Sequence, residues 1–182
     1  MEDTLREYSH AIDSGKGGLL FSVVGGKMSE GINFNDNLGR GVIMVGLPFP
    51  NSQNAEWRAK LQHVEKVAAQ NSTESTLDFA RNAGRDFYEN ACMRTVNQGI
   101  GRVIRHKHDY AVILLLDQRY SLQRITGKLP GWIRDRVVNG EHKSFADLMR
   151  RTGVFFRAKG EGGGKGGGGE GRGGREGKLE LP

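Results

Sequence analysis

The sequence predicts an α/β fold with an open, mostly parallel sheet and helices on both faces. Two observations predict it: three short apolar runs lack the polar alternation of half-exposed strands, and helical patterns lie between the runs. The runs are residues 18–24, 41–47 and 110–116. We expect each run to be a central strand, because strands of parallel sheets are buried on both sides.

The helices follow in chain order. One is expected at the amino terminus, and another after the second run, where apolar residues recur at spacings of three and four at Trp57, Leu61, Val64 and Ala68. A longer helix is expected from about residue 77 to 106. Two more are expected at 129–137, with Pro130 near its start, and at 144–158. This order is the alternation of an open α/β sheet.

The formal net charge is +6, and the whole excess lies on the body of the chain. Residues 160–177 are mostly glycine and contain no apolar residue, so we expect a flexible tail in which basic and acidic residues cancel. The arginine-glycine segment 171–175 is typical of single-strand binding, but its neutral surroundings favour a plain extension. The charge of the body favours a polyanionic partner such as nucleic acid.

Cysteine, histidine and hydropathy patterns exclude several classes of protein. Cys92 is the only cysteine, which excludes a disulfide, a cysteine-based zinc site and a cysteine-ligated cluster within the chain, and packing is favoured over nucleophilic chemistry. His106 and His108 have no third ligand nearby, so no metal site is expected. No apolar run approaches the roughly 18 residues of a membrane span, so we expect a soluble, intracellular protein without a membrane partner.

Gly26 and Lys27 follow the first apolar run, where a phosphate-binding loop could stand. Such a P-loop requires G-x-x-x-x-G-K-[ST]. Here Phe21 occupies the position of the first glycine, and Met28 that of the magnesium-binding hydroxyl. No acidic box is present either, so the sequence contains neither half of an autonomous ATP–magnesium site. Because ligands bind at the carboxyl ends of strands in open α/β sheets, the loop 25–37 is still expected to carry chemistry.

The end of the long helix is expected to carry a basic face. One amide, one glycine and two guanidiniums recur at i, i+3, i+4 and i+7, at Gln98, Gly101, Arg102 and Arg105. Apolar residues occupy the opposite side, at Met93, Val96, Ile100, Val103 and Ile104. No carboxylate occurs from 94 to 107, and two arginines spaced three apart can grip one phosphate. An ordinary exposed basic face is the alternative.

These motifs together resemble the second motor domain of iron–sulfur DEAH-box DNA helicases of the XPD-like group, closest to the chromosome-loss branch associated with sister-chromatid cohesion. The resemblance covers about residues 1–138 and rests on four stretches in order: GGKMSEGINF, VGLPFPN, Q-x-x-G-R-x-x-R and HDYAVILLLDQRY. It implies a RecA-like domain that faces a first motor domain across an ATP cleft, with single-stranded DNA running over both. Trp57 and Trp132 are then expected in the core rather than stacked on bases.

The resemblance also implies roles for single residues. Arg102 and Arg105 would be arginine fingers toward the γ-phosphate, Gln98 would position the nucleotide or its water, and Gly101 would allow close approach. The nucleotide cleft would be edged by Gly31 and Asn33, and the DNA-backbone loop would comprise Gly26, Lys27, Ser29 and Glu30. Two departures stand out: many relatives outside the branch have aspartate at position 33, and Gly99 replaces the usual alanine, which costs about 1 kcal/mol of helix stability.

By the same resemblance, ATP and Mg²⁺ would be shared with a first motor domain that is not in this chain, and no iron–sulfur cluster is expected here. The implied partners are single-stranded DNA and that first domain, and the implied location is the nucleus, with a role in DNA repair. We expect a helicase domain at 1–138, a helical extension at 139–159 and a tail at 160–182, and no ATP hydrolysis by the chain alone. The alternative is a non-catalytic protein that binds nucleic acid or a helicase.

Overall fold

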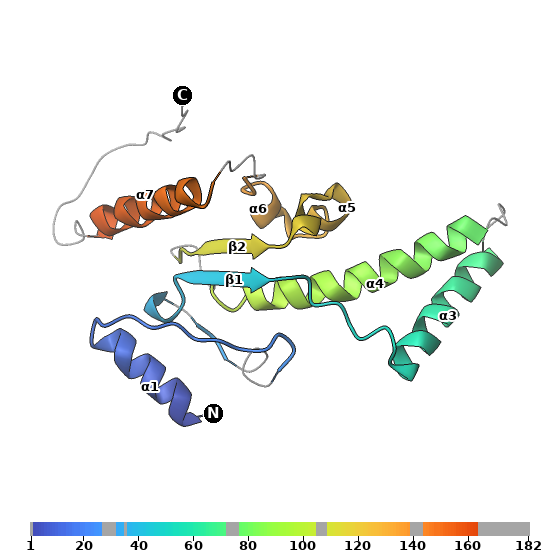
Figure 1. Ribbon diagram of the computed structural model, residues 1–182, viewed down its shortest axis with the longest axis horizontal. Coiled ribbons are helices and arrows are strands. Elements are labelled where there is room, and N and C mark those ends of the chain that lie inside the picture. Colours follow the sequence, from blue (N-terminus) through green and yellow to red (C-terminus); the bar gives the residue numbers. More distant parts are fainter. Residues whose placement is uncertain are drawn as a thin grey trace, which may run out of the picture. The chain divides into compact units, whose positions relative to one another are not determined.

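The computed structural model describes residues 2–26, 32–34, 36–71, 77–104, 109–138 and 144–163 (Figure 1). The chain divides into two compact units, Met1–Asn139 and Gly140–Pro182. The first unit opens with helix α1 (Glu2–Asp13), whose Tyr8 hydroxyl donates a hydrogen bond of 2.8 Å to the carbonyl of Leu38 at the end of the short helix η1 (Asp36–Leu38). This bond fixes the amino-terminal helix to the segment that leads into the sheet.

Strands β1 (Gly41–Val45) and β2 (Val112–Leu116) pair in parallel, with Gly41 opposite Val112 and Val45 opposite Leu116 (Figure 1). The predicted parallel pairing of these two runs is thereby confirmed. Met44 is buried beneath the sheet, whereas Ile43 and Val45 keep 52% and 80% of their surface exposed. We expected both faces of each strand to be covered. Within the described part of the first unit, only the face of β1 that carries Met44 is buried.

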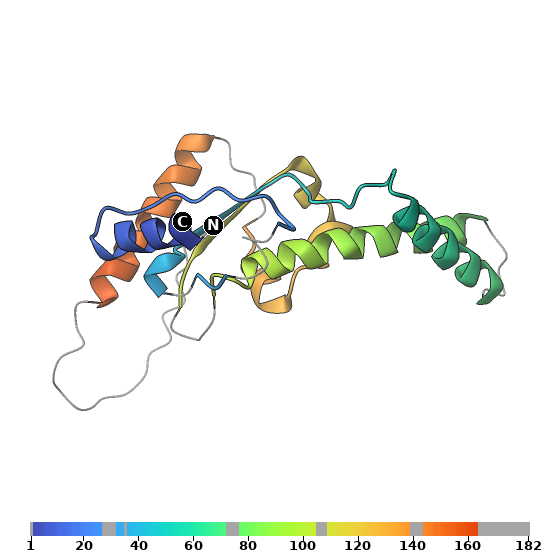
Figure 2. The same cartoon turned by 90° about the horizontal axis from the view of Figure 1, so that it is seen from below.

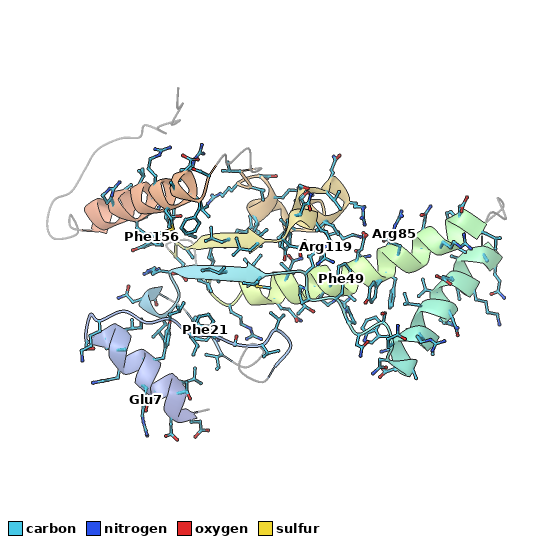
Figure 3. The ribbon with its side chains drawn as sticks, viewed as in Figure 1. Glu7, Phe21, Phe49, Arg85, Arg119 and Phe156 are labelled. Atoms are coloured by element: carbon cyan, nitrogen blue, oxygen red, sulfur yellow. The ribbon has the colours of Figure 1, made fainter. Side chains whose placement is uncertain are left out.

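The first apolar run was expected to form a strand, and this prediction is wrong. Residues 18–24 form no strand and pair with none that the structure describes. Leu19 is 72% exposed, and Phe21, labelled in Figure 3, is 82% exposed. A strand needs a neighbour that satisfies its backbone N–H and C=O groups. The apolar pattern indicates that the segment favours a strand. Whether the strand forms depends on a second segment that can pair with it, which the local pattern does not reveal.

Two long helices, α3 (Ala55–Asn71) and α4 (Leu77–Ile100), pack against each other (Figure 2). The side chain of Asn54 caps α3, because its Oδ1 accepts hydrogen bonds from the backbone N–H groups of Glu56 and Trp57 at 2.8 and 3.4 Å. On α4, the predicted apolar side is confirmed: Cys92, Met93, Val96 and Ile100 are each at most 1% exposed. This side of α4 faces Met44 in the core.

Three short helices follow β2: η2 (Gln118–Ser121), α5 (Gln123–Thr126) and α6 (Gly131–Arg134). They complete the core with Tyr120, Ile125, Leu129 and Ile133. The sequence predicted a helix at 129–137 with Pro130 near its start; helix α6 does begin directly after Pro130, but it ends at Arg134 and is shorter than predicted. Trp132 was expected in this core but is 48% exposed, because it precedes the inward-facing Ile133 and so lies on another side of a single helical turn.

The second unit contains helix α7 (Phe145–Gly163). Ser144 caps its start, since Ser144 Oγ accepts a hydrogen bond of 3.2 Å from the N–H of Asp147. The helix was expected to end at residue 158, but it continues to 163 and thereby includes the first four residues of the predicted tail. The rest of that tail, from residue 164 onward, lies outside the described residues.

Candidate functional site

The predicted arginine motif begins on α4 and continues into the turn that follows it. The long helix was expected to run to about residue 106, and this bound is wrong, because the helix ends at Ile100. Gly101 N still donates to Asn97 O at 2.9 Å, as in an α-helix, but Arg102 N donates to Gly99 O and Val103 N to Ile100 O, both at 3.2 Å and across three residues rather than four. Two glycines, 99 and 101, lower the helix propensity here.

The turn brings Arg102 to Asn33, which lies 69 residues earlier in the sequence. Arg102 Nη1 donates a hydrogen bond of 3.3 Å to Asn33 Oδ1, and the backbone N–H of Phe34 donates one of 3.0 Å to the carbonyl of Arg102. One contact orients the guanidinium and the other fixes the backbone from which it extends. The structure thus joins two of the residues that the sequence predicts at a nucleotide cleft.

Close packing beneath this contact explains Gly39. A Cβ on Gly39 would overlap the carbonyl oxygen of Phe34 and approach Val103 Cγ1 to 3.0 Å, so only glycine admits both neighbours. Gly39 lies two residues before β1, which places the contact between Asn33 and Arg102 near the amino-terminal end of the sheet. The loop 25–37 was expected at the carboxyl ends of the strands, and for Asn33 and Phe34 this expectation is wrong.

A buried ion pair holds the same end of the sheet. Arg40 Nη1 lies 3.0 Å from Asp109 Oδ1, whose side chain is fully buried, and the Arg40 guanidinium stands 4.0 Å from the centre of the Tyr110 ring. Arg40 belongs to the segment before β1, and Asp109 to the segment before β2. The ion pair therefore connects the segment between Asn33 and β1 to the segment between the arginine motif and β2.

The remaining predicted residues fall in three groups. Gln98 is exposed on α4, and Gly101 is half-buried in the turn after it. Gly26 closes a turn in which its N–H donates to the carbonyl of Val23 at 3.0 Å. Five predicted residues lie outside the described part of the chain: Lys27, Ser29, Glu30, Gly31 and Arg105.

Among the described residues, no cluster of three or more histidine, cysteine, aspartate or glutamate side chains could hold a metal ion. None of the described helices is both long and apolar enough to cross a membrane.

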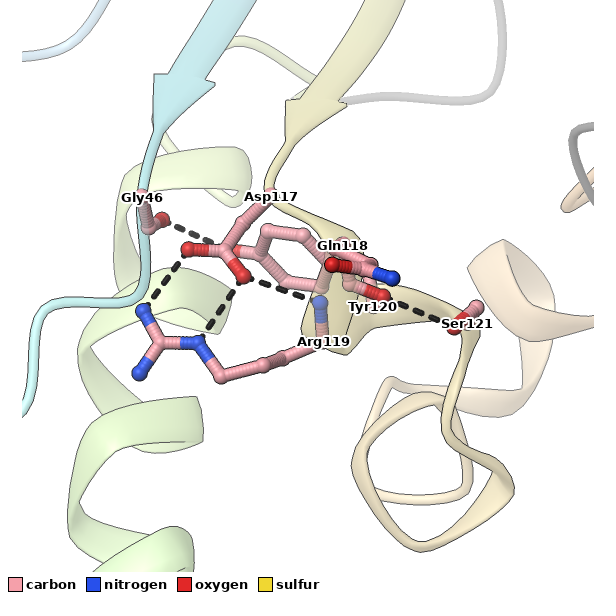
Figure 4. A network of polar contacts seen from close by, with 6 residues as sticks. All are labelled: Gly46, Asp117, Gln118, Arg119, Tyr120 and Ser121. Atoms are coloured by element: carbon pink, nitrogen blue, oxygen red, sulfur yellow. Dashed lines mark hydrogen bonds and ion pairs between the residues drawn. The ribbon is translucent and has the colours of Figure 1, made fainter.

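The opposite end of the sheet carries a polar cluster that the sequence reasoning missed (Figure 4). Asp117 follows β2 and accepts three hydrogen bonds from Arg119: from its backbone N–H at 2.9 Å, from Nε at 2.9 Å and from Nη2 at 2.7 Å. The hydrogen bonds from the Arg119 side chain are the main cause that lowers the pKa of Asp117 to about 2. The D-x-R spacing directly after a strand was the signal that could have indicated this pair.

Tyr120 completes the cluster. Its hydroxyl donates a hydrogen bond of 3.2 Å to the carbonyl of Gly46, which follows β1, so it links the carboxyl ends of the two strands (Figure 4). Burial raises the pKa of Tyr120 to about 12. The hydroxyl is therefore protonated at neutral pH and remains a donor.

Aromatic rings extend from this cluster along α3 and α4. We name Phe49, Tyr88 and Trp57 the aromatic row. The Arg119 guanidinium lies 5.4 Å from the Phe49 ring centre (Figure 3), Phe49 stacks on Tyr88 at 5.0 Å, and Trp57 meets Tyr88 edge-on at 6.3 Å. Lys60 Nζ stands 5.3 Å from the Trp57 ring at the far end. All three rings are half-buried, so Trp57 is only partly in the core where the sequence placed it.

Comparisons with known proteins identify the family of the chain. Residues 1–136 match the family model described as the helicase C-terminal domain. The ATP-dependent DNA helicase chl1 of Aspergillus clavatus is 54% identical over 163 residues, which cover 87% of this chain and 22% of that helicase. The proteins of the same name in Coccidioides immitis and Schizosaccharomyces pombe are 58% and 49% identical, covering 76% and 86% of this chain and 16% and 18% of each helicase. The chain thus spans about a fifth of the length of these relatives.

Proposed function

Because the chain belongs to the helicase C-terminal domain family, we propose that it serves as the second motor domain of an ATP-dependent DNA helicase of the chl1 type. In this role, residues 1–138 face a first motor domain that binds ATP and Mg²⁺, and the following helical extension and tail are additions to the motor. The relatives are named as DNA helicases, and the same role for this chain implies a nuclear protein that acts on single-stranded DNA.

The contact between Arg102 and Asn33 carries the proposal. The bond of 3.3 Å from Arg102 Nη1 to Asn33 Oδ1 helps to orient the guanidinium. The backbone bond from Phe34 to Arg102 keeps the turn at a fixed place on the domain. An arginine held in this way can meet a phosphate of a nucleotide bound by the opposite domain.

Within that motor, Arg102 and Arg105 act as arginine fingers toward the γ-phosphate, and Gln98, Gly101, Gly31 and Asn33 edge the nucleotide cleft. An arginine finger raises the rate of phosphoryl transfer by about a thousandfold to a hundred-thousandfold, or roughly 4 to 7 kcal/mol of barrier. The P-loop and the magnesium ligands must come from the first motor domain, since the sequence lacks a G-x-x-x-x-G-K-[ST] motif. The chain alone is therefore inactive.

ATP hydrolysis in the presence of single-stranded DNA tests this role. The pure chain is compared with the chain mixed with a separately expressed first motor domain of a close relative. We expect no turnover by either part and Mg²⁺-dependent turnover by the mixture, with loss of turnover in Arg102→Ala and Arg105→Ala. Arg85→Ala is the matched control, because Arg85 is an exposed arginine on α4 that bonds only to Asn82 among described residues.

Two outcomes would reject the proposal. Turnover by the pure chain that disappears in Arg102→Ala would mean that the chain is itself an enzyme. No turnover by any mixture, with every protein folded, would favour a non-catalytic protein that binds nucleic acid or a helicase.

The aromatic row supports a DNA-binding surface for the same motor. The half-exposed aromatic rings of the row provide faces on which bases can stack. The loop of Gly26, Lys27, Ser29 and Glu30 is proposed as a further contact to the backbone. With one motor domain only, we expect weak binding that falls steeply as salt rises.

Fluorescence anisotropy with a labelled single-stranded oligonucleotide tests the row. Base stacking on an aromatic side chain contributes about 1–3 kcal/mol, so Tyr88→Leu is expected to weaken binding by about five- to hundredfold. Phe79→Leu is the control, because Phe79 is an exposed ring on α4 outside the row. Equal effects of the two substitutions, or tight binding that salt does not change, would count against this surface.

A further inference from the structure

A polar pocket opens on α4 beside Gln98. It has a volume of about 430 Å³ and is lined by Asn90, Met93, Arg94, Asn97, Gln98 and Lys128. Asn90, Arg94 and Gln98 follow one another at intervals of four and therefore form a stripe along the helix. Lys128, from the segment between α5 and α6, closes the other side. Apart from Gln98, none of these residues belongs to the proposed ATP site.

The walls of this pocket are held in place by their own hydrogen bonds. Lys128 Nζ is paired with Asp86 and donates a hydrogen bond of 2.6 Å to Asn90 Oδ1. The backbone carbonyl of Lys128 accepts one of 3.0 Å from Asn97 Nδ2. The side chain of Lys128 is only 16% exposed, so its ammonium stays at a fixed position beside the pocket.

Unused hydrogen-bonding capacity is concentrated in the same place. Within the described part of the chain, Arg94 forms no ion pair and the Gln98 side chain has no hydrogen bond. Asn97 Oδ1 is buried without a partner, the one such side-chain atom among the residues described. An ammonium has three N–H donors, of which Lys128 uses two here. Arg94 and Gln98 are exposed, but native proteins satisfy nearly all buried polar groups, so the unpaired Asn97 Oδ1 indicates that something binds in the pocket.

The side chains that line the pocket indicate which kind of ligand it can bind. Arg94 and Lys128 favour an anionic group, and a guanidinium matches the oxygens of a phosphate. A bare anion would leave the amide of Asn97 unsatisfied, because an amide oxygen requires an N–H or O–H donor. A ligand with both a phosphate and a ring that carries N–H groups meets both demands.

We propose that this pocket binds one nucleotide unit, with its phosphate on Arg94 and Lys128 and its base edge on Asn97 and Gln98. The pocket volume lies in the range of small-ligand sites, which is roughly 300–1,000 Å³. The unit comes either from a free nucleotide or from a single strand of nucleic acid, and both present the same chemistry. The inference does not depend on ATP hydrolysis, although the proposed function supplies both ligands.

Titration calorimetry of the full 182-residue chain tests this site. The probes are adenosine monophosphate, inorganic phosphate and a short single-stranded oligonucleotide. Adenosine monophosphate lacks the γ-phosphate on which the arginine fingers act. We expect it to bind more tightly than inorganic phosphate, and Arg94→Gln to weaken it about tenfold, as the loss of a charged hydrogen bond does. Arg81→Gln is the control, because it removes the same charge from an exposed position of α4 outside the pocket.

The results of this titration distinguish a free nucleotide from a unit of a single strand, and this pocket from the proposed ATP site. Sensitivity to Arg94→Gln for adenosine monophosphate supports a free-nucleotide site, and the same sensitivity for the oligonucleotide alone supports a unit of a strand. Absence of binding by both, or equal losses in Arg94→Gln and Arg81→Gln, would overturn the inference. Binding lost in Arg102→Gln but kept in Arg94→Gln would place the ligand at the proposed ATP site, so that this inference would fail and the proposed function would stand.

Discussion

The two ends of the sheet hold their exposed arginines in different ways. At the carboxyl end, Arg119 makes three hydrogen bonds to the carboxylate of Asp117, and its charge is balanced there. At the amino end, one contact of Arg102 is a hydrogen bond of 3.3 Å to the neutral amide of Asn33. Hydrogen bonds between two charged groups are about twice as strong as those between neutral groups. The pair of Arg119 and Asp117 is thus a contact of the fold, whereas the bond between Arg102 and Asn33 is the weaker of the two contacts compared.

A different pair of residues stabilises the amino end of the sheet. Arg40 and Asp109 join the two segments that enter the strands, and Gly39 lets Phe34 and Val103 pack closely. The ion pair and the contact between Arg102 and Asn33 are therefore separate parts of one end of the sheet. Stability and chemistry should respond to different substitutions, which gives three predictions in order of decreasing effect.

The largest effect is expected from the buried ion pair. Asp109→Ala should lower the free energy of unfolding by about 3 kcal/mol, because it leaves Arg40 without its buried partner. The value lies at the lower end of the usual range, since the Arg40 side chain is 26% exposed. Urea denaturation measures it. Asp3→Ala breaks an ion pair whose two side chains are both 80% exposed, and it should change stability by less than about 1 kcal/mol. Similar losses in both variants would contradict the anchoring role of Asp109.

An intermediate effect is expected at the carboxyl end. Asp117→Asn removes the ion pair and weakens the cap of η2, and should lower Tm at neutral pH by a few degrees.

The pH dependence of Tm tests the same pair. The pKa of Asp117 is lowered to about 2 from its ordinary value of 3.8, so its contribution is complete above about pH 4 and is lost as the pH falls toward 2. Scanning calorimetry should therefore show the difference in Tm between the chain and Asp117→Asn shrinking over that interval. Asp13→Asn, which changes an exposed carboxylate of α1, is the control. A difference that stays constant down to pH 2 would contradict the ion pair.

The smallest effect is expected at Asn33. One neutral hydrogen bond contributes about 0.5–1.5 kcal/mol, so Asn33→Ala should slow ATP hydrolysis by the reconstituted motor about two- to tenfold. Asn82→Ala removes a matched contact, from Arg85 Nη2 to Asn82 Oδ1 at 2.9 Å, at a place outside the site. If Asn33→Ala still slowed hydrolysis after Arg102 had been replaced by glutamine, Asn33 would act independently of Arg102.

Much of the fold could be predicted, because local patterns report it. The helical spacing of Trp57, Leu61, Val64 and Ala68 predicted α3, and unbroken apolar runs predicted β1 and β2. The run 18–24 has the same local pattern but lacks a described partner, and pairing is a property of two segments. Helix α4 ends earlier than its periodicity implied because two glycines weaken the last turn.

The site was predicted less completely. The sequence singled out Arg102 and Asn33 separately, through a resemblance, but their contact spans 69 residues and depends on how the turn after α4 is folded. The same turn places Arg102 after the end of α4, where the helix was expected to continue. Asp117 and Arg119 were missed because a short-range pair after a strand looks like any polar loop. Trp132 was misplaced, since one turn of helix α6 gives too little periodicity to assign a buried side.

Parallel measurements on Arg102→Gln and Asp117→Asn test the central claim most directly. For each variant, Tm is recorded for the chain alone and ATP hydrolysis for the chain mixed with a first motor domain and single-stranded DNA. We predict that Arg102→Gln lowers hydrolysis by about a thousandfold or more with Tm unchanged, whereas Asp117→Asn lowers Tm and leaves hydrolysis within about twofold below that Tm. An Arg102→Gln motor that hydrolyses ATP at the wild-type rate would contradict the account.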